Sequence, residues 1–370
     1  MEKKRVFGTG GELLVHQLVA QGVPYAFTNT GSAEAGFFNA LLTVPGVQPI
    51  LLLAESLVLS AADGYAKASR KPAFVNVHLA AGTRQGSGQL QNAYFDGTPM
   101  VVTAAMRDVG SYGDHGALVA SGGFSQMGTV EDITKRRWEV WDAGGIPTVT
   151  RRAFKDALTF PTGPVYVAYA SSALEATNVE GLIQAADAPH MGLVPDASVI
   201  HAIWDALLNA EKPLLVCGPD IAAAGAEDEI LTLAERLGCR WPPASSTTAA
   251  SPCITRTMRA PSRLSPRTGY DVVCCVGYRQ NTRGNATDLR FASAGTIIGI
   301  GQDPSQLGNT FALDIAVWGN VRHTLSALNA SWKDADARQP HLERRRTDVR
   351  ARGRAADSQA ARRGHGARDG

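Results

Sequence analysis

Two side chains in the first third of the sequence combine a residue type and a position that suit catalysis. Glu55 follows the apolar run Ile50-Leu-Leu-Leu-Ala and precedes a segment with helical spacing. A carboxylate between a buried strand and an apolar helix would be shielded from water, so it could share a proton near neutral pH. An acid at this position would also stabilise the N-terminus of the helix, and its position alone does not separate the two interpretations.

His78 lies at the end of a second predicted strand, at the same sheet edge as Glu55. This edge is where α/β sheets bind ligands, and an imidazole exchanges protons near neutral pH. A single His at a strand end can equally be structural. Ser32 stands in a Gly-Ser turn after the predicted strand 25–28, where a serine makes a good helix N-cap.

Alternating strands and helices must position these side chains. Hydrophobic spacing predicts helices over 12–21, 33–42, 55–69 and 86–95, and strands over 25–28, 50–54, 73–79, 100–104 and 165–170. The run 50–54 is continuously apolar, which is typical of a strand buried on both faces. This alternation predicts a mostly parallel sheet covered by helices.

A second α/β unit follows, with helices expected over 199–208, 227–237 and 321–328 and strands over 213–217, 271–276 and 296–300. The fold class is therefore α/β with two Rossmann-like parallel-sheet domains. We place the N-terminal domain at 1–180, the central domain at 195–332 and a disordered basic tail at 333–370. The Ser/Ala/Glu-rich stretch after residue 170, up to about Pro195, is the expected linker.

Two segments do not fit this pattern. Residues 240–268 contain ten Ser or Thr, five Pro, five Arg and no acidic residue, where a regular unit should show a strand and a helix. Residues 333–370 carry 11 Lys or Arg against 6 Asp or Glu, a net charge of +5, and almost no large apolar side chains. Both resemble out-of-frame translation of GC-rich DNA, and both are also compatible with a natural disordered loop and tail.

Composition excludes several classes of protein. No segment is apolar enough over the length of a membrane span, and no export signal follows the N-terminus. The five cysteines show no metal-ligand spacing, so we expect reduced thiols in a cytoplasmic protein and no metal bound by cysteine. We do not expect nucleic-acid binding by the cluster Arg344-Arg-Arg, because acidic residues are interspersed in the tail and it contains no aromatic residue for stacking.

Several stretches resemble the thiamine-diphosphate enzyme family that includes benzoylformate decarboxylase and acetolactate synthase. Residues 25–32 are similar to the family's first strand and Gly-Ser turn, and residues 55–66 to its glutamate and following helix. Residues 75–83, 88–93 and 98–104 resemble the benzoylformate decarboxylase branch in particular. The resemblance covers about 8–175, and more weakly about 195–330.

This resemblance implies roles for individual residues. Glu55 matches the glutamate that hydrogen-bonds the cofactor's aminopyrimidine and stabilises its imino tautomer, while the cofactor supplies the chemistry. His78 matches an acid/base group, and Ser32 matches a substrate-contacting serine. Gly88 and Asn92 match positions that shape a cofactor-facing turn, although both residue types are common in turns for local reasons.

The chain also departs from the family. Ala54 stands where a His usually precedes the glutamate, and no His lies between His201 and His323 to act as the branch's second active-site His. The Gly-Asp-Gly and later Asn that bind magnesium and the cofactor's diphosphate are also missing, Gly113-Asp-His being the nearest string. We therefore expect the magnesium and the diphosphate to need a third domain that this chain lacks, so that the chain alone would be inactive.

The sequence thus predicts a thiamine-diphosphate-dependent decarboxylase or carboligase acting on a small 2-oxo acid. We expect a homo-oligomer, or a partner chain that carries the diphosphate-binding domain. The alternative is a non-catalytic protein whose central unit binds a nucleotide, for which the Gly turns after residues 217 and 298 are weak signals.

Overall fold

The computed structural model describes residues 3–29, 31–108, 125–185, 189–211, 213–237, 270–279, 295–309 and 311–334. The chain divides into two compact units, Met1–His190 and Met191–Gly370. Each contains a parallel sheet with helices, which confirms the predicted α/β fold class. The atypical segment 240–268 and the predicted disordered tail from residue 335 onward lie outside the described residues.

The first unit is built on a six-stranded sheet with the order β3-β2-β4-β5-β7-β6, in which all pairs are parallel. Its strands are β2 (Tyr25–Thr28), β3 (Gln48–Leu51), β4 (Ala73–Val77), β5 (Met100–Met106), β6 (Arg137–Val140) and β7 (Val165–Ala170). The central strands β4, β5 and β7 are buried along their whole length, as parallel strands covered on both faces should be. A separate antiparallel pair joins β1 (Lys4–Gly8) to β8 (Val179–Ile183).

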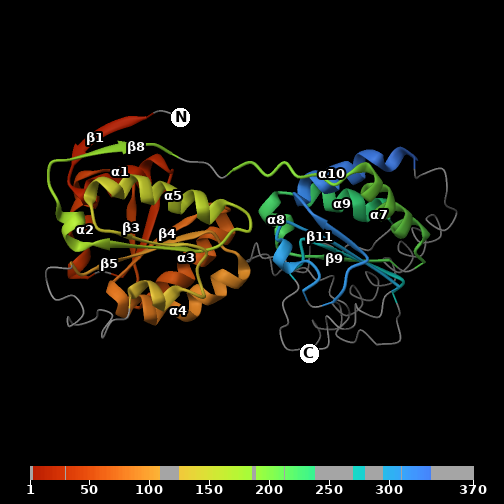
Figure 1. Cartoon of the computed structure of the whole chain (residues 1–370), viewed down its shortest axis with the longest axis horizontal. Helices are drawn as coiled ribbons and strands as arrows, with labels where there is room; N and C mark the ends of the chain where they lie inside the picture. Colours follow the sequence, from red (N-terminus) through yellow and green to blue (C-terminus); the bar gives the residue numbers. More distant parts are fainter. Residues whose placement is uncertain are drawn as a thin grey trace, which may run out of the picture. The chain divides into compact units, whose positions relative to one another are not determined.

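Helices cover both faces of this sheet, with α1 and α5 on one face and α3 and α4 on the other (Figure 1). The helices are α1 (Gly10–Ala20), α2 (Ala35–Thr43), α3 (Glu55–Ser69), α4 (Leu79–Asp96), α5 (Ile146–Leu158) and α6 (Ser171–Glu175). Short 3-10 turns are η1 (Ser32–Glu34), η3 (Gln126–Val130) and η4 (Ala143–Gly145). Thr9 and Glu12 form a capping box that fixes the start of α1.

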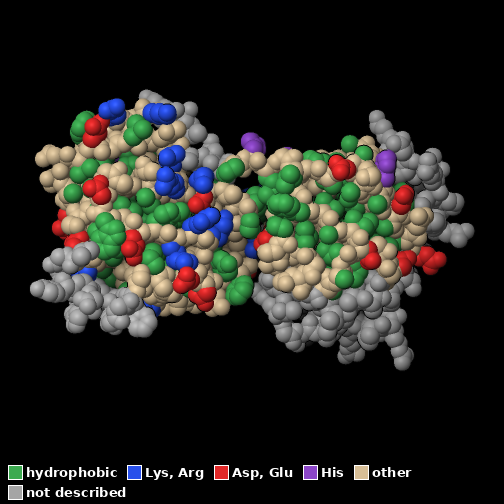
Figure 2. Space-filling view, viewed as in Figure 1, with side chains coloured by type: hydrophobic (Ala, Val, Ile, Leu, Met, Phe, Trp, Pro, Cys, Tyr) green, Lys and Arg blue, Asp and Glu red, His purple; other side chains and the backbone are tan. Residues whose placement is uncertain are grey.

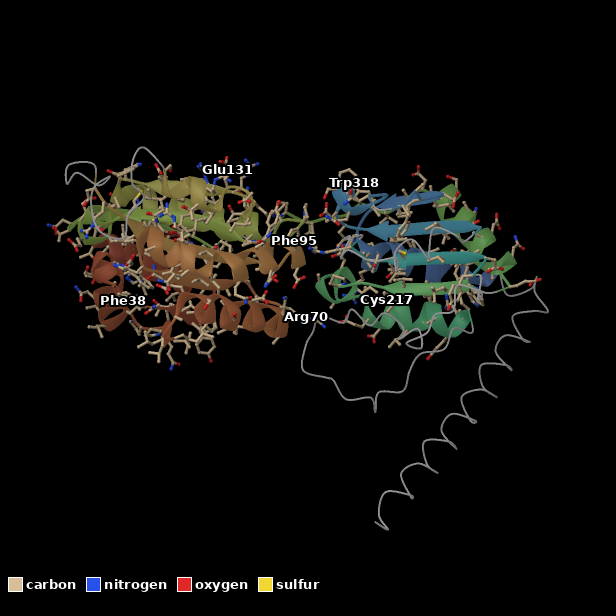
Figure 3. All side chains as sticks on the ribbon, turned by 90° about the horizontal axis from the view of Figure 1, so that it is seen from below. Phe38, Arg70, Phe95, Glu131, Cys217 and Trp318 are labelled. Carbon is tan, nitrogen blue, oxygen red and sulfur yellow. The ribbon has the colours of Figure 1, made fainter. Side chains whose placement is uncertain are left out.

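Helices α3 and α4 run side by side from the carboxyl edge of the sheet. Arg70, just after α3, and Phe95, in the last turn of α4, lie at the same end of the unit (Figure 3). Near that end the ammonium of Lys67 on α3 lies 2.7 Å from carboxylate oxygens of both Asp63 and Asp96. This cluster ties the distal ends of the two helices together.

Three sequence-based expectations about this unit are wrong in detail. The apolar run 50–54 is not a strand buried on both faces, because β3 lies at the edge of the sheet, where the exposed fractions of Leu51 and Leu53 are 60% and 90%. Part of the expected linker is folded, since it forms α6 and also β8, which pairs with β1. Helix α4 begins seven residues before the predicted start at Gly86, directly after His78.

The second unit contains a four-stranded parallel sheet with the order β12-β11-β10-β9. Its strands are β9 (Pro213–Cys217), β10 (Val272–Val276), β11 (Thr296–Gly301) and β12 (Ile315–Trp318), and its helices are α7 (Ala197–Asn209), α8 (Asp220–Ala224), α9 (Glu227–Arg236) and α10 (Val321–Ala330). Apolar side chains of α7, α9 and α10 form the main core with one face of the sheet. This arrangement matches the predicted Rossmann-like pattern.

On the face shown in Figure 2, Lys and Arg side chains gather over part of the first unit, while the second unit shows mainly apolar and uncharged atoms with a few Asp and Glu side chains. Within the described residues, no helix combines the length and apolar character needed to cross a membrane.

Candidate functional site

Three loops at the carboxyl edge of the first sheet carry the predicted site residues. In the sheet, β2 lies between β3 and β4. The connection that leads from β3 to β4 along the chain therefore passes from one side of β2 to the other. Such a switch point is where open α/β sheets bind ligands. The residues that follow β2, β3 and β4 include Ser32, Glu55 and His78, so all three predicted side chains come from this edge.

His78 is paired with a buried acid. Its Nδ1 lies 2.7 Å from Oε2 of Glu34, and the exposed fractions of the two side chains are 17% and 0%. Glu34 ends the turn η1, which immediately follows β2. The other carboxylate oxygen, Oε1, accepts hydrogen bonds from the backbone N–H groups of Leu79 (3.2 Å) and Ala105 (2.9 Å).

These contacts fix the orientation of the imidazole. The carboxylate of Glu34 faces Nδ1 as an acceptor, so Nδ1 donates and the neutral ring keeps Nε2 free of a proton. Leu79, directly after His78, has φ of 52°, a left-handed conformation that leucine rarely adopts. The bond from its N–H to Glu34 helps to hold that conformation, so the acid organises both the ring and the backbone beside it.

Glu55 is the first residue of α3, and its exposed fraction is 7%. Within the described residues its carboxylate has no hydrogen-bond or ion-pair partner. It lies over Gly82 of α4, where a Cβ would be 2.9 Å from Oε1 and 3.2 Å from Cγ of Glu55. Gly82 lies one turn after His78 and donates its N–H to the His78 carbonyl oxygen. Glu55 therefore lies against the first turn of α4, the turn that begins at His78.

The Gly-Ser turn also reaches the imidazole. A Cβ on Gly31 would lie 1.9 Å from Nδ1 of His78, so only glycine fits at this position. Ser32 is exposed and is the first residue of η1 rather than its N-cap, which is Gly31. The N-cap interpretation of Ser32 is therefore wrong, and its hydroxyl is accessible beside the His78 turn.

Gly88 and Asn92 do not form a turn, which corrects the sequence-based expectation. Both are exposed positions in the middle of α4, where no atom lies within 4 Å of a Cβ built on Gly88. Asn92 donates a hydrogen bond to the Gln89 side chain (3.2 Å). Their assignment to the cofactor stays a prediction, whereas Gly82 is the glycine of α4 that lies against Glu55.

Sequence reasoning missed Glu34. A signal was present, because Glu34 is a single charged residue in the otherwise small or apolar stretch 33–38. A buried charge in such a stretch requires a partner. The partners come from β4 and β5, which are distant in sequence, so the pairing itself was not visible.

Within the described ranges, no group of three or more His, Cys, Asp or Glu side chains is placed to hold a metal ion.

Comparisons with known proteins agree with this geometry. Residues 8–129 match the thiamine pyrophosphate enzyme N-terminal TPP binding domain, and residues 200–328 match the central domain of the same enzymes. The acetolactate synthase large subunit of Buchnera aphidicola subsp. Schizaphis graminum is 26% identical over 342 residues, 86% of this chain and 57% of that protein. Benzoylformate decarboxylase of Pseudomonas aeruginosa is 30% identical over 326 residues, 83% of this chain and 59% of that protein.

Among solved structures, the thiamine diphosphate-dependent 4-hydroxybenzoylformate decarboxylase of Rhodococcus jostii RHA1 superimposes with a TM-score of 0.70 at 26% identity. The match covers 90% of this chain and 63% of that one. The chain thus spans less than two thirds of the length of these relatives. With matches to both domains and to this fold, the chain belongs to the thiamine pyrophosphate enzyme family.

Proposed function

We propose that the chain provides the aminopyrimidine half of a thiamine-diphosphate site in an enzyme that decarboxylates 2-oxo acids or joins them to a second carbonyl compound. Glu55 carries this proposal. Glu55 is 7% exposed at the switch point of the sheet, its carboxylate has no partner within the described residues, and it lies against Gly82, one helical turn after His78.

The residues present fit the cofactor's aminopyrimidine. A carboxylate that is mostly shielded and has no protein partner within the described residues is available to accept a hydrogen bond from a ligand, and a protonated ring nitrogen is such a donor. The missing side chain at Gly82 leaves room beside the carboxylate that any Cβ would fill. Glu55 would accept this hydrogen bond and, through its negative charge, favour the protonated ring nitrogen.

When bound, the cofactor supplies an electron sink for the carbon from which carbon dioxide leaves. His78 would hold or release a proton at Nε2, because Glu34 holds Nδ1. Ser32 would contact the substrate from the Gly-Ser turn, which packs against the imidazole. These roles are the ones that the resemblance to the family implies for the two residues.

The substrate class that we propose is an aryl or branched 2-oxo acid rather than a substrate of acetolactate synthesis. Two of the relatives described above are decarboxylases of benzoylformate and 4-hydroxybenzoylformate. The segment from His78 to Thr83 resembles that branch. We propose that magnesium and the diphosphate are bound by another domain, as the resemblance to the family implies.

We propose that a partner chain carries that domain. We also propose a cytoplasmic location. In its support, the five cysteines of the sequence are scattered and odd in number, unlike the disulfide framework of a secreted protein.

Calorimetric titration of the chain with thiamine diphosphate and magnesium tests the proposal, and carbon dioxide release from benzoylformate and from pyruvate is expected only once the diphosphate-binding domain is supplied. A hydrogen bond to a charged group contributes about 1.5–3 kcal/mol, so Glu55→Gln should weaken binding by about tenfold to 150-fold. Glu131→Gln, an exposed acid paired with Arg137, is the matched control and should bind like the unsubstituted chain. Equal affinity of the Glu55→Gln variant would refute the assignment.

A second candidate function is nucleotide binding by the second unit. Gln302 follows β11 at the carboxyl edge of that sheet, is 1% exposed, and neither its side-chain nitrogen nor its oxygen has a hydrogen-bond partner. An amide in this state suits a ligand with a donor and an acceptor side by side, such as a nucleobase. Titration with flavin adenine dinucleotide and with adenosine diphosphate tests it, and no binding of either would rule this candidate out.

A further inference from the structure

A buried chain of hydrogen bonds lies beneath the pair formed by His78 and Glu34. The hydroxyl of Tyr166, on β7, lies 2.7 Å from Nε2 of Gln126 and 2.8 Å from Oγ1 of Thr83. The Thr83 hydroxyl in turn donates to the Leu79 carbonyl oxygen at 2.9 Å. Tyr166 and Thr83 are fully buried and Gln126 is almost so.

The donors in this chain follow from the chemistry of its groups. The Gln126 nitrogen can only donate, so the Tyr166 oxygen accepts from it. The Leu79 carbonyl can only accept, so the Thr83 hydrogen is used there and Tyr166 must donate to Thr83. Burial raises the pKa of Tyr166 to about 12, so this hydroxyl keeps its hydrogen at neutral pH.

Both ends of the chain reach the backbone that holds Glu34. One end is the Leu79 carbonyl, and the N–H of Leu79 donates to Oε1 of Glu34. At the other end Gln126 also donates to the Ala105 carbonyl oxygen (3.1 Å), and the N–H of Ala105 donates to the same Oε1. Tyr166 therefore connects the two residues whose amides bind the carboxylate.

We propose that Tyr166 is a positioning residue: its hydroxyl fixes the Leu79 and Ala105 backbones, and through them holds the Glu34 carboxylate against Nδ1 of His78. The importance of this for catalysis rests on the proposed role of His78. The structural effect itself does not, because it concerns a hydrogen bond present in the chain without cofactor or substrate.

The same strand supplies a matched control. Tyr169, three residues on and on the opposite face of β7, is equally buried, and its hydroxyl lies 2.8 Å from Oγ1 of Thr150. Thr150 donates to the Ile146 carbonyl oxygen on α5, just as Thr83 does to Leu79 on α4. Tyr169 makes no contact with Glu34 or its two backbone donors in the described hydrogen bonds. Tyr166→Phe and Tyr169→Phe thus remove the same atom from similar surroundings.

The experiment measures the Nδ1 proton of His78 by NMR on the full chain, without ligand, with its signal assigned through His78→Gln. The unsubstituted chain and Tyr169→Phe should show a downfield, slowly exchanging proton. In Tyr166→Phe its exchange with solvent should be about tenfold faster, the change expected from losing about 1.4 kcal/mol of hydrogen bonding. Thr83→Val, which cuts the link to Leu79, should give the same increase.

An unchanged exchange rate in Tyr166→Phe, or an equal increase in Tyr169→Phe, would overturn the proposal. If Tyr166→Phe does not fold, the exchange rate of the His78 Nδ1 proton in Thr83→Val tests the proposal by the same criterion. Failure of Glu55→Gln to alter cofactor binding would refute the proposed function and leave this result standing, so the two are distinguishable.

Discussion

Gly82→Ala should damage the site while leaving the fold intact. The new Cβ would lie 2.9 Å from Oε1 and 3.2 Å from Cγ of Glu55, whereas ordinary contacts begin at 3.4 Å. The carboxylate must therefore move by about 0.5 Å to reach a normal van der Waals distance. This movement is cheap, because the atom that yields is the end of a flexible side chain.

The expected magnitudes follow from the same geometry. Alanine is favoured over glycine in a helix interior by about 1 kcal/mol, which corresponds to about 2–4 °C in melting temperature for a unit of this size. Gly88→Ala, on the same helix with no atom within 4 Å, should show this full gain. Gly82→Ala should melt within about 2 °C of the unsubstituted chain, since displacement of Glu55 offsets the gain.

Cofactor binding should separate the effect of Gly82 on helix stability from its effect on the position of the Glu55 carboxylate. A displacement of about 1 Å can reduce activity about a hundredfold, so a shift of half that size should weaken binding of thiamine diphosphate about tenfold. Calorimetry measures the affinity and thermal unfolding measures the stability. Unchanged affinity in Gly82→Ala, with the fold intact, would refute the assignment of Glu55 to the cofactor.

Three further predictions concern the same part of the molecule. Gly86→Ala should lower the melting temperature by up to about 8 °C, because its Cβ would lie 2.2 Å from Cδ1 of Leu59 and overpacking costs about 1–3 kcal/mol, of which the helix preference for alanine offsets about 1 kcal/mol. Glu34→Gln should abolish the Nδ1 proton signal of His78, because an amide nitrogen facing Nδ1 favours the other tautomer; persistence of the signal would contradict the assigned donor. Lys67→Met should lower the melting temperature at pH 7 by about 2–4 °C, and the difference should begin to shrink once the pH rises above about 10.5.

The sign of this pH effect follows from the environment of Lys67. Burial alone would lower the pKa of the ammonium, but its bonds to Asp63 and Asp96 outweigh burial and raise the pKa above 10.5. A group whose pKa is raised by folding stabilises the protein fully below its unfolded pKa. That contribution is lost as the pH rises through the raised value. A difference between the two proteins that persists at pH 12 would contradict this account.

Much of the fold could be predicted from local patterns. Periodicity gave α3 with its bounds, and short apolar runs gave β2, β7 and β9, because each of these elements has a clear start and end in the sequence. The exposed edge strand β3 could not be recognised, since an apolar run has the same composition whether its strand lies at the centre or at the edge of a sheet. The pairing of β8 with β1 joins segments about 175 residues apart and leaves no local signal.

The site was predictable in part for a similar reason. Glu55 and His78 stand at the ends of recognisable strands, so topology alone brings them to one edge. Glu34 and Gly82 matter through contacts with other elements, namely the His78 ring and the Glu55 carboxylate. Such contacts depend on how η1, α3 and α4 pack against one another, and residue spacing along the sequence does not predict that packing.

The central claim is that Glu55 accepts a hydrogen bond from the aminopyrimidine. Saturation-transfer NMR on the pyrimidine protons of thiamine and of thiamine diphosphate tests it most directly, because both compounds carry this ring whatever binds the diphosphate. The account predicts transfer from the unsubstituted chain and from Glu131→Gln, and its loss in Glu55→Gln. Equal transfer from the Glu55→Gln variant, or no transfer from the unsubstituted chain, would contradict it.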